Sequence, residues 1–121
     1  MAVRVLVVDD SPTIVNMLSL VLRQHGLEAL GAADGQEALG QLQRQAVDLV
    51  ITDVNMPNMD GFALITAIRA NPAWRGLPII VLTTESAPQD HEAGLRRGAD
   101  LYVTKPVKPA DLMVMVRSLL T

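Results

Sequence analysis

Four short apolar segments of this sequence each end at a polar residue whose side chain could take part in chemistry. These residues are an aspartate pair, a further aspartate, a threonine and a lysine: Asp9 and Asp10, Asp53, Thr83, and Lys105. In an open parallel sheet, ligands bind in the crevice beyond the carboxyl ends of the strands, so residues far apart in the sequence meet there. Three carboxylates, a hydroxyl and an ammonium in one crevice suit a divalent cation together with a phosphoryl group.

The elements that must position these residues alternate along the chain. Apolar segments of strand length alternate with segments of helical period, which is typical of βαβ units whose parallel sheet is covered on both faces. The expected strands are Val3–Val8, Leu27–Ala33, Asp48–Thr52, Pro78–Leu82 and Asp100–Thr104. The second of these is rich in small residues and contains Gly31, which suits the edge of a sheet.

The expected helices follow from capping residues and from apolar residues at helical spacing. Ser11 is an N-cap with Pro12 at the first helical position, and that helix ends at His25-Gly26. Two further pairs have the spacing of a capping box, Asp34 with Glu37 and Ser86 with Gln89. The other boundaries are Asp60 and Asn71 for the third helix, Gly98 for the end of the fourth, and Pro109 and Leu120 for the fifth.

These elements predict an α/β fold of the (βα)5 type with a five-stranded parallel sheet. Because crossover connections are right-handed, few arrangements of five strands remain, and the flavodoxin-like, doubly wound order 2-1-3-4-5 is one of them. It places the first, third, fourth and fifth strands side by side. This order is adopted from known folds of the type and is an identification rather than a derivation from the residues.

The composition limits the classes of function. The 121 residues match one domain, expected to span 1–121 with no output domain. The net charge of −3 and the scattered basic residues argue against nucleic acid as a partner. No apolar stretch approaches the roughly 18–20 residues that cross a bilayer, and Met1–Val8 lacks the features of a signal peptide. With no cysteine for disulfides, a cytoplasmic protein that does not contact membranes is expected.

Four motifs together resemble the receiver domain of bacterial two-component response regulators, most closely the stand-alone chemotaxis type. They are Val-Leu-Val-Val-Asp-Asp at 5–10, Asp-Val-Asn-Met-Pro-Asn-Met-Asp-Gly at 53–61, Val-Leu-Thr-Thr-Glu-Ser at 81–86 and Gly-Ala-Asp-Leu-Tyr-Val-Thr-Lys-Pro at 98–106. Each motif alone is weak, but four in register form a specific signature. The resemblance extends from Val3 to Leu120.

The resemblance implies a role for each residue of the crevice. Asp53 is implied to accept a phosphoryl group from a phosphohistidine of a sensor histidine kinase or phosphotransfer protein. Mg²⁺ is implied as the cofactor, held by Asp9, Asp10, Asp53 and the backbone carbonyl of Asn55. Thr83 and Lys105 are implied to contact the phosphoryl oxygens, and a cis peptide bond is implied before Pro106, where it serves a tight turn.

Elementary chemistry supports these roles. Clustered carboxylates repel one another, and each added negative charge raises the cost of keeping the others ionised. A dication offsets that cost, and Mg²⁺ prefers oxygen ligands and retains waters and phosphate oxygens in its shell. Phosphoryl transfer asks the protein for positioning and charge neutralisation. An aspartyl phosphate is a mixed anhydride that hydrolyses readily, so it provides a signal that can be reset.

The resemblance also implies how the signal is read. Thr83 is expected to move toward the phosphoryl group, and Tyr102 to rotate from an exposed to a buried rotamer in the space released. The output surface would consist of the fourth helix, fifth strand and fifth helix, and it would bind a downstream target protein. The protein itself is expected to be a monomer or a weak dimer. Asn55, Thr84 and Glu85 occupy the positions that tune phosphorylation and hydrolysis. The alternative for Tyr102 is a half-buried strand aromatic with its hydroxyl in water.

Other functions fit the residues less well. A haloacid-dehalogenase-type phosphatase needs a second aspartate two positions after the nucleophile, where Ser11-Pro12 stands. A flavin-binding module needs a phosphate loop after the first strand, and Asp9-Asp10 would repel the phosphate. The remaining alternative is a degenerate receiver that binds partners without phosphorylation. The sequence leaves the kinase, the target and the pathway open, with chemotaxis or motility as one candidate pathway.

Overall fold

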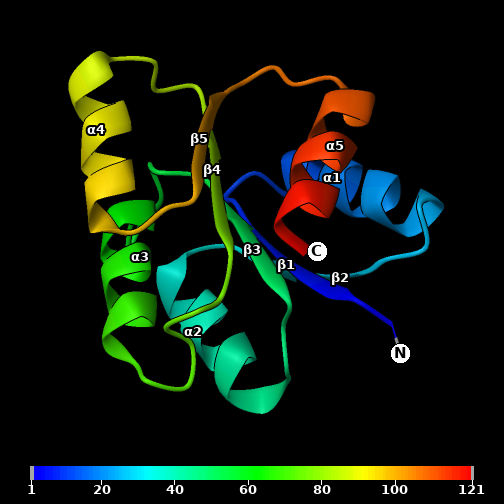
Figure 1. Ribbon diagram of the computed structural model, residues 1–121, viewed down its shortest axis with the longest axis horizontal. Coiled ribbons are helices and arrows are strands. Elements are labelled where there is room, and N and C mark those ends of the chain that lie inside the picture. The colour runs from blue at the N-terminus through cyan, green and yellow to red at the C-terminus, as the bar shows by residue number, and fades with distance from the viewer. Residues whose placement is uncertain (1, 121) are drawn as a thin grey trace.

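The computed structural model describes residues 2–120, and its five strands form one parallel sheet in the order β2-β1-β3-β4-β5 (Figure 1). The strands are β1 (Arg4–Val8), β2 (Glu28–Ala32), β3 (Leu49–Thr52), β4 (Ile79–Thr83) and β5 (Leu101–Thr104). The helices are α1 (Pro12–Gln24), α2 (Gly35–Arg44), α3 (Gly61–Ala70), α4 (Pro88–Arg97) and α5 (Pro109–Leu120). The predicted flavodoxin-like order is confirmed, with β2 at an edge. The outermost residues of the expected 1–121 domain, 1 and 121, lie outside the described part.

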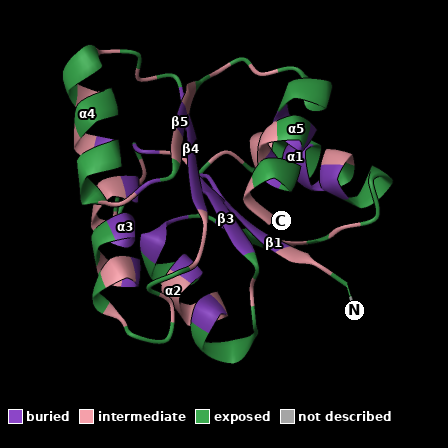
Figure 2. Cartoon of the chain, viewed as in Figure 1, coloured by how far each residue is buried: buried purple, intermediate pink, exposed green. Residues whose placement is uncertain are grey.

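The sheet lies between two layers of helices. Helices α1 and α5 cover one face, and α2, α3 and α4 cover the other (Figure 1). Every residue of β3 and β4 is buried, as the central strands in Figure 2 show. Their continuous apolar sequence therefore follows from burial on both faces. Across residues 2–120, no helix combines the length and apolar character that crossing a bilayer demands.

Three of the predicted helix caps are confirmed by hydrogen bonds. The side chain of Ser11 accepts the N–H of Ile14 (3.4 Å), that of Asp34 accepts the N–H of Glu37 (2.9 Å), and that of Asp60 accepts the N–H of Ala63 (2.8 Å). Each bond satisfies a backbone donor that the first helical turn leaves without an internal partner.

The prediction that Ser86 caps the fourth helix is wrong. Helix α4 begins at Pro88, and Ala87 is its N-cap, with no side-chain hydrogen bond. A proline disfavours helical conformation in the residue before it, and Ala87 is accordingly extended (φ −62°, ψ 134°). Ser86 therefore lies in the loop before the helix, one residue too early to cap it.

At the amino ends of β4 and β5, the Arg69 guanidinium ties three segments together. Nε and Nη2 donate to the carbonyl of Gly98 (3.0 and 2.7 Å), and Nη1 donates to the carbonyls of Leu77 and Arg75 (2.6 and 2.9 Å). Nη2 also pairs with Asp100 (3.2 Å). This cation on α3 thus fixes the entry to β4 and the turn into β5.

Candidate functional site

Three aspartates from two neighbouring strands lie together at the carboxyl edge of the sheet. Asp9 and Asp10 follow β1, Asp53 follows β3, and one carboxylate oxygen from each lies within 4.8 Å of the others. The backbone holds them there, because the N–H of Asp53 donates to the carbonyl of Val8 (2.9 Å) and the N–H of Asp9 to the carbonyl of Ala32 (3.0 Å). The hydrogen bonds of the sheet therefore continue to the residues that carry the charge.

Lys105 brings the compensating positive charge from the end of β5. Its ammonium donates to Asp9 Oδ2 (2.7 Å) and to Asp53 Oδ2 (3.2 Å), and its own backbone N–H donates to the carbonyl of Thr83 (2.7 Å). The peptide bond between Lys105 and Pro106 is cis, as expected. Asp9 and Lys105, which were predicted to share one crevice, are thus in contact although 96 positions separate them.

The electrostatics of this cluster favour the charged form of the lysine. Burial lowers the pKa of Lys105, but the hydrogen bond to Asp9 and the negative charges of Asp53 and Asp9 outweigh that effect. The pKa of Lys105 is consequently raised above its ordinary value. The Asp9 side chain is almost fully buried, 4% exposed, and the Asp53 side chain is 13% exposed, so these charges interact with little screening by water.

Backbone donors orient the two carboxylates that Lys105 contacts. Asp9 Oδ1 accepts the N–H of Ser11 (2.9 Å), and Asp53 Oδ1 accepts the N–H of Val54 (2.6 Å). One oxygen of each carboxylate is thus turned toward the backbone and the other toward the ammonium. Asp10 is exposed, so the cluster opens to solvent on its side.

The three aspartates have the donor chemistry that a magnesium ion prefers. Mg²⁺ binds hard oxygen ligands and is usually held by one or two carboxylates together with waters and phosphate oxygens. The cluster offers carboxylate oxygens at close quarters and contains no sulfur or imidazole ligand. The residues present therefore fit the cofactor expected from the sequence.

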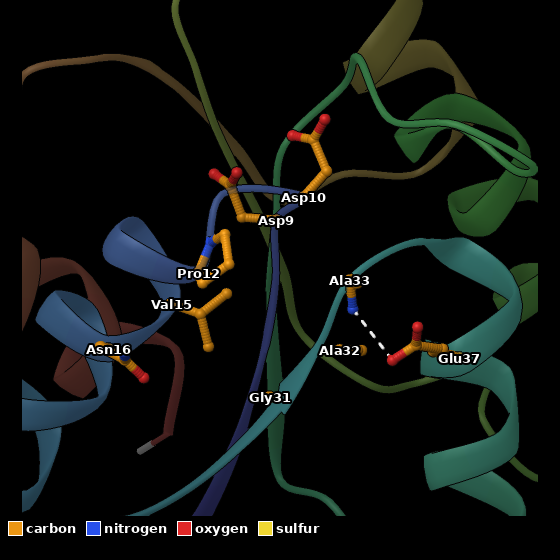
Figure 3. A pocket seen from close by; sticks show the side chains of 9 residues that line it. All are labelled: Asp9, Asp10, Pro12, Val15, Asn16, Gly31, Ala32, Ala33 and Glu37. Atoms are coloured by element: carbon orange, nitrogen blue, oxygen red, sulfur yellow. Dashed lines mark hydrogen bonds between the residues drawn. The ribbon is translucent and has the colours of Figure 1, made fainter.

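A hollow of about 210 Å³ lies beside the acidic cluster (Figure 3). The side chains of Asp9 and Asp10 project from the end of β1 at its border, and the carboxylate of Glu37 accepts the N–H of Ala33 (3.2 Å) opposite them. The remaining lining comes from the start of α1 and the end of β2: Pro12, Val15, Asn16, Gly31 and Ala32. The hollow gives a small molecule or a partner's side chain room to approach the carboxylates.

Glu85, in the loop between β4 and α4, connects Asn55 and Thr83 with Tyr102 of β5. Its carboxylate accepts the Asn55 amide (2.6 Å), its N–H donates to the hydroxyl oxygen of Thr83 (3.3 Å), and its carbonyl accepts the hydroxyl of Tyr102 (2.9 Å). Glu85 was predicted only as a tuning residue, and its central position among these contacts was not predicted. Its neighbour Thr84 is exposed.

Tyr102 does not have the exposed rotamer from which its switching role was expected to start. The residue is buried, 7% exposed, and its hydroxyl is hydrogen-bonded rather than left in water, so the half-buried alternative does not describe it either. Burial, followed by the charges of Asp90, Glu85 and Asp53, raises the pKa of Tyr102.

The loop that carries Asp53 and Asn55 is held against α2 by contacts that the sequence analysis missed. Asn58, in left-handed backbone conformation (φ 66°), donates its amide to Asp34 (2.8 Å), the same carboxylate that caps α2. The hydrogen bond from Asn58 lowers the pKa of Asp34, and the bond from the N–H of Glu37 adds to this effect. The Asn-Met-Asp-Gly run at the end of the second motif is the signal for such a turn, because asparagine tolerates this conformation.

Comparison with known proteins finds one matching family and closely similar solved structures. The model of one family, described as the response regulator receiver domain, matches residues 5–117. A chemotaxis protein of Vibrio cholerae, CheY4, superposes with a TM-score of 0.94 at 39% identity, over 99% of this chain and all of that one.

Two curated relatives differ in how much of their own length this chain matches. The probable transcriptional regulatory protein TcrX of Mycobacterium tuberculosis is 41% identical over 119 residues, which is 98% of this chain and 50% of TcrX. An uncharacterised 14.6 kDa protein of Leptolyngbya boryana is 41% identical over 113 residues, 93% of this chain and 86% of that protein. The chain thus spans about half the length of several curated relatives that it matches.

Proposed function

The chain belongs to the response regulator receiver domain family, and on that basis we propose that it is a switch of two-component signalling in which Asp53 accepts the phosphoryl group. Receiver domains are phosphoacceptor signalling modules rather than classical enzymes, and they partner with histidine kinases. The observation that carries the proposal is the joint contact of the Lys105 ammonium with Asp9 and Asp53 beside the exposed Asp10.

The proposed reaction transfers a phosphoryl group to a carboxylate oxygen of Asp53. A new O–P bond forms as the bond between phosphorus and the donor's imidazole nitrogen breaks, and the imidazole leaves with the bonding electron pair. Negative charge spreads over the equatorial oxygens during such a transfer. Lys105 lies where its ammonium neutralises that charge, and the Val54 N–H orients the carboxylate from its other side.

Mg²⁺ is the cofactor that we propose for this site. Asp9, Asp10 and Asp53 would hold it with the backbone carbonyl of Asn55. When bound, it supplies charge neutralisation for the carboxylates and for the incoming phosphoryl oxygens. The approach of one carboxylate oxygen from each of the three aspartates to within 4.8 Å of the others supports this assignment.

We propose that the signal leaves through the surface formed by α4, β5 and α5, which binds the downstream partner. The hydrogen bonds of Glu85 to Thr83 and Tyr102 support this route, because they connect Thr83, which we propose contacts the phosphoryl group, with β5 through the loop before α4. A hydroxyl drawn toward a phosphoryl group would therefore disturb both bonds that converge on Glu85.

For the pathway, we propose two-component signalling and no specific target. CheY4 is a chemotaxis protein and TcrX a probable transcriptional regulator, so similarity alone supports both kinds of pathway. The chemotaxis assignment, the cytoplasmic location, the monomer or weak dimer and the lack of an output domain stay predictions.

Intact-mass spectrometry with acetyl phosphate and Mg²⁺ tests the proposed function. The expected result is a mass increase of one phosphoryl group that depends on Mg²⁺, disappears in Asp53→Asn and persists in the matched control Asp111→Asn, which changes an exposed carboxylate on α5. No adduct on the folded wild-type chain would instead support the degenerate receiver. An adduct that persists in Asp53→Asn would place the acceptor elsewhere.

A further inference from the structure

Helix α4 contacts β5 through a glycine that local helix preference does not explain. Among the ten residues of α4, all of which the structure describes, Gly94 is the one that is buried. A glycine inside a helix costs roughly 0.5–1 kcal/mol relative to alanine. Since Gly94 has no left-handed backbone angle that would require glycine, the reason lies in what its missing side chain leaves room for.

The space beside Gly94 is filled by the ring of Tyr102. A β-carbon at position 94 would lie 2.7 Å from Cδ2 and 3.1 Å from Cε2 of Tyr102, which is too close for carbon atoms. The nearest atom of Phe62 would be at 3.5 Å, an ordinary contact. Alanine at this position is therefore incompatible with the inward ring of Tyr102 and compatible with the rest of the surroundings.

Two further contacts complete the space around this ring, and we call this space, bounded by Gly94, His91 and the Glu85 carbonyl, the slot. The ring of His91, one turn earlier on α4, packs against Tyr102 with centroids 5.0 Å apart and planes tilted by 40°. The hydroxyl at the far end donates to the carbonyl of Glu85 (2.9 Å). The ring thus meets Gly94 and His91 of α4, and its hydroxyl is anchored in the β4–α4 loop; Figure 1 shows α4 beside β5.

We propose that Gly94 is a positioning residue that admits the Tyr102 ring between α4 and β5 and thereby decides which of two shapes this surface presents. With glycine, the ring lies inward under His91 and the hydroxyl reaches Glu85. With a larger residue, the ring must leave the slot and stand on the surface of β5. The importance of this surface for signalling rests on the proposed function, but the slot itself does not.

A stability cycle tests the slot, with Gly40→Ala as the matched control. Gly40 also lies inside a helix, α2, and a β-carbon there would come no closer than 3.7 Å to Arg44. We expect Gly40→Ala to raise the midpoint of thermal unfolding and Gly94→Ala to lower it. In a Tyr102→Ala background, both substitutions should raise it, because the obstructing ring is gone. A Gly94→Ala that stabilises the wild-type chain, or that destabilises the Tyr102→Ala chain equally, overturns the proposal.

A second measurement observes the ring directly. Tyr102 is the single tyrosine of the chain, so ring-labelled tyrosine gives one set of NMR signals. We expect a nuclear Overhauser effect between the Tyr102 and His91 rings in the wild type and in Gly40→Ala, and its loss in Gly94→Ala. Retention of that contact in folded Gly94→Ala overturns the proposal. The phosphoryl adduct is measured separately on the same variants, so a missing adduct counts against the proposed function and not against the slot.

Discussion

The ammonium of Lys105 lies 2.7 Å from a carboxylate oxygen of Asp9, a residue 96 positions earlier in the chain. The pair is largely withdrawn from water, with side chains 15% and 4% exposed. A second carboxylate, that of Asp53, shares the same ammonium. One cation therefore offsets the repulsion between a buried and a partly buried acid that follow different strands.

Replacing this lysine should destabilise the protein and make it more dependent on magnesium. Removal of one partner from a buried ion pair leaves an uncompensated charge and costs about 3 kcal/mol. We expect Lys105→Met to lose stability of this order in chelator, and Mg²⁺ to recover more of it than it adds to the wild type. Urea unfolding with and without Mg²⁺ measures both effects. The exposed Lys108→Met is the control, and equal stability of both variants would contradict the pairing.

Magnesium binding should depend on Asp10. This residue is exposed, so Asp10→Ala removes one carboxylate of the cluster at little cost in packing. At a hundred times its dissociation constant, a ligand that binds only the folded state adds about 2.7 kcal/mol. We expect Mg²⁺ to raise the unfolding midpoint of the wild type and to have much less effect on Asp10→Ala. An unchanged response, measured by thermal unfolding, would remove Asp10 from the metal site.

The ionisation of Tyr102 should cost stability at alkaline pH. Burial and nearby acids raise the folded-state pKa of Tyr102 above its usual 10.0, so the unfolded chain loses this proton first as the pH rises. The folded state binds more protons in that window, and stability therefore falls from about pH 10 upward. At neutral pH, Tyr102→Phe should lose about 0.5–1.5 kcal/mol with the hydrogen bond to Glu85.

Urea unfolding of Tyr102→Phe at several pH values measures this difference. The difference in the free energy of unfolding between wild type and variant should become smaller above pH 10, because phenylalanine has no hydroxyl to ionise. A gap that is constant from neutral to alkaline pH would show that the hydroxyl is not held in the buried position.

Gly61 should be intolerant of any side chain. A β-carbon there would collide with the backbone carbonyl oxygen of Asp53, which cannot move aside as a flexible side chain does. Crowding of this kind costs about 1–3 kcal/mol. We therefore expect Gly61→Ala to be destabilised and to form less phosphoryl adduct. Gly76→Ala, where a β-carbon would have no neighbour within 4 Å, should behave like the wild type in both measurements.

Thr84 should slow access to the acceptor. It is exposed and directly follows the buried Thr83, so we expect its bulk to crowd the approach of a phosphodonor. We expect Thr84→Ala to accelerate phosphorylation by acetyl phosphate, measured as the rate of adduct formation by mass spectrometry. A rate equal to or below that of the wild type would reject crowding by this side chain.

Much of the fold and the clustering of the site follow from local signals combined with one global rule. The caps at Ser11, Asp34 and Asp60 were predictable because each side chain bonds within its own first turn. Asp53 and Lys105 were brought together in advance because the carboxyl ends of parallel strands share one edge.

The remainder depends on contacts that no short stretch of sequence encodes. Ser86 was misread because Pro88 shifts the helix start, although the spacing to Gln89 fits a cap. The central position of Glu85 uses its backbone carbonyl and N–H, which every residue has. The inward rotamer of Tyr102 depends on a glycine eight positions earlier, whose absent side chain leaves no pattern of its own.

The Arg69 contacts have a consequence for where the molecule yields. They fasten α3, the entry to β4 and the turn before β5 at the base of the sheet, opposite the aspartates. When an anion binds at the carboxyl edge, these contacts therefore oppose separation of β4 and β5 at their amino ends. Any movement that follows is therefore expected in the loops at the carboxyl edge, while Arg69 holds the amino ends of β4 and β5 in place.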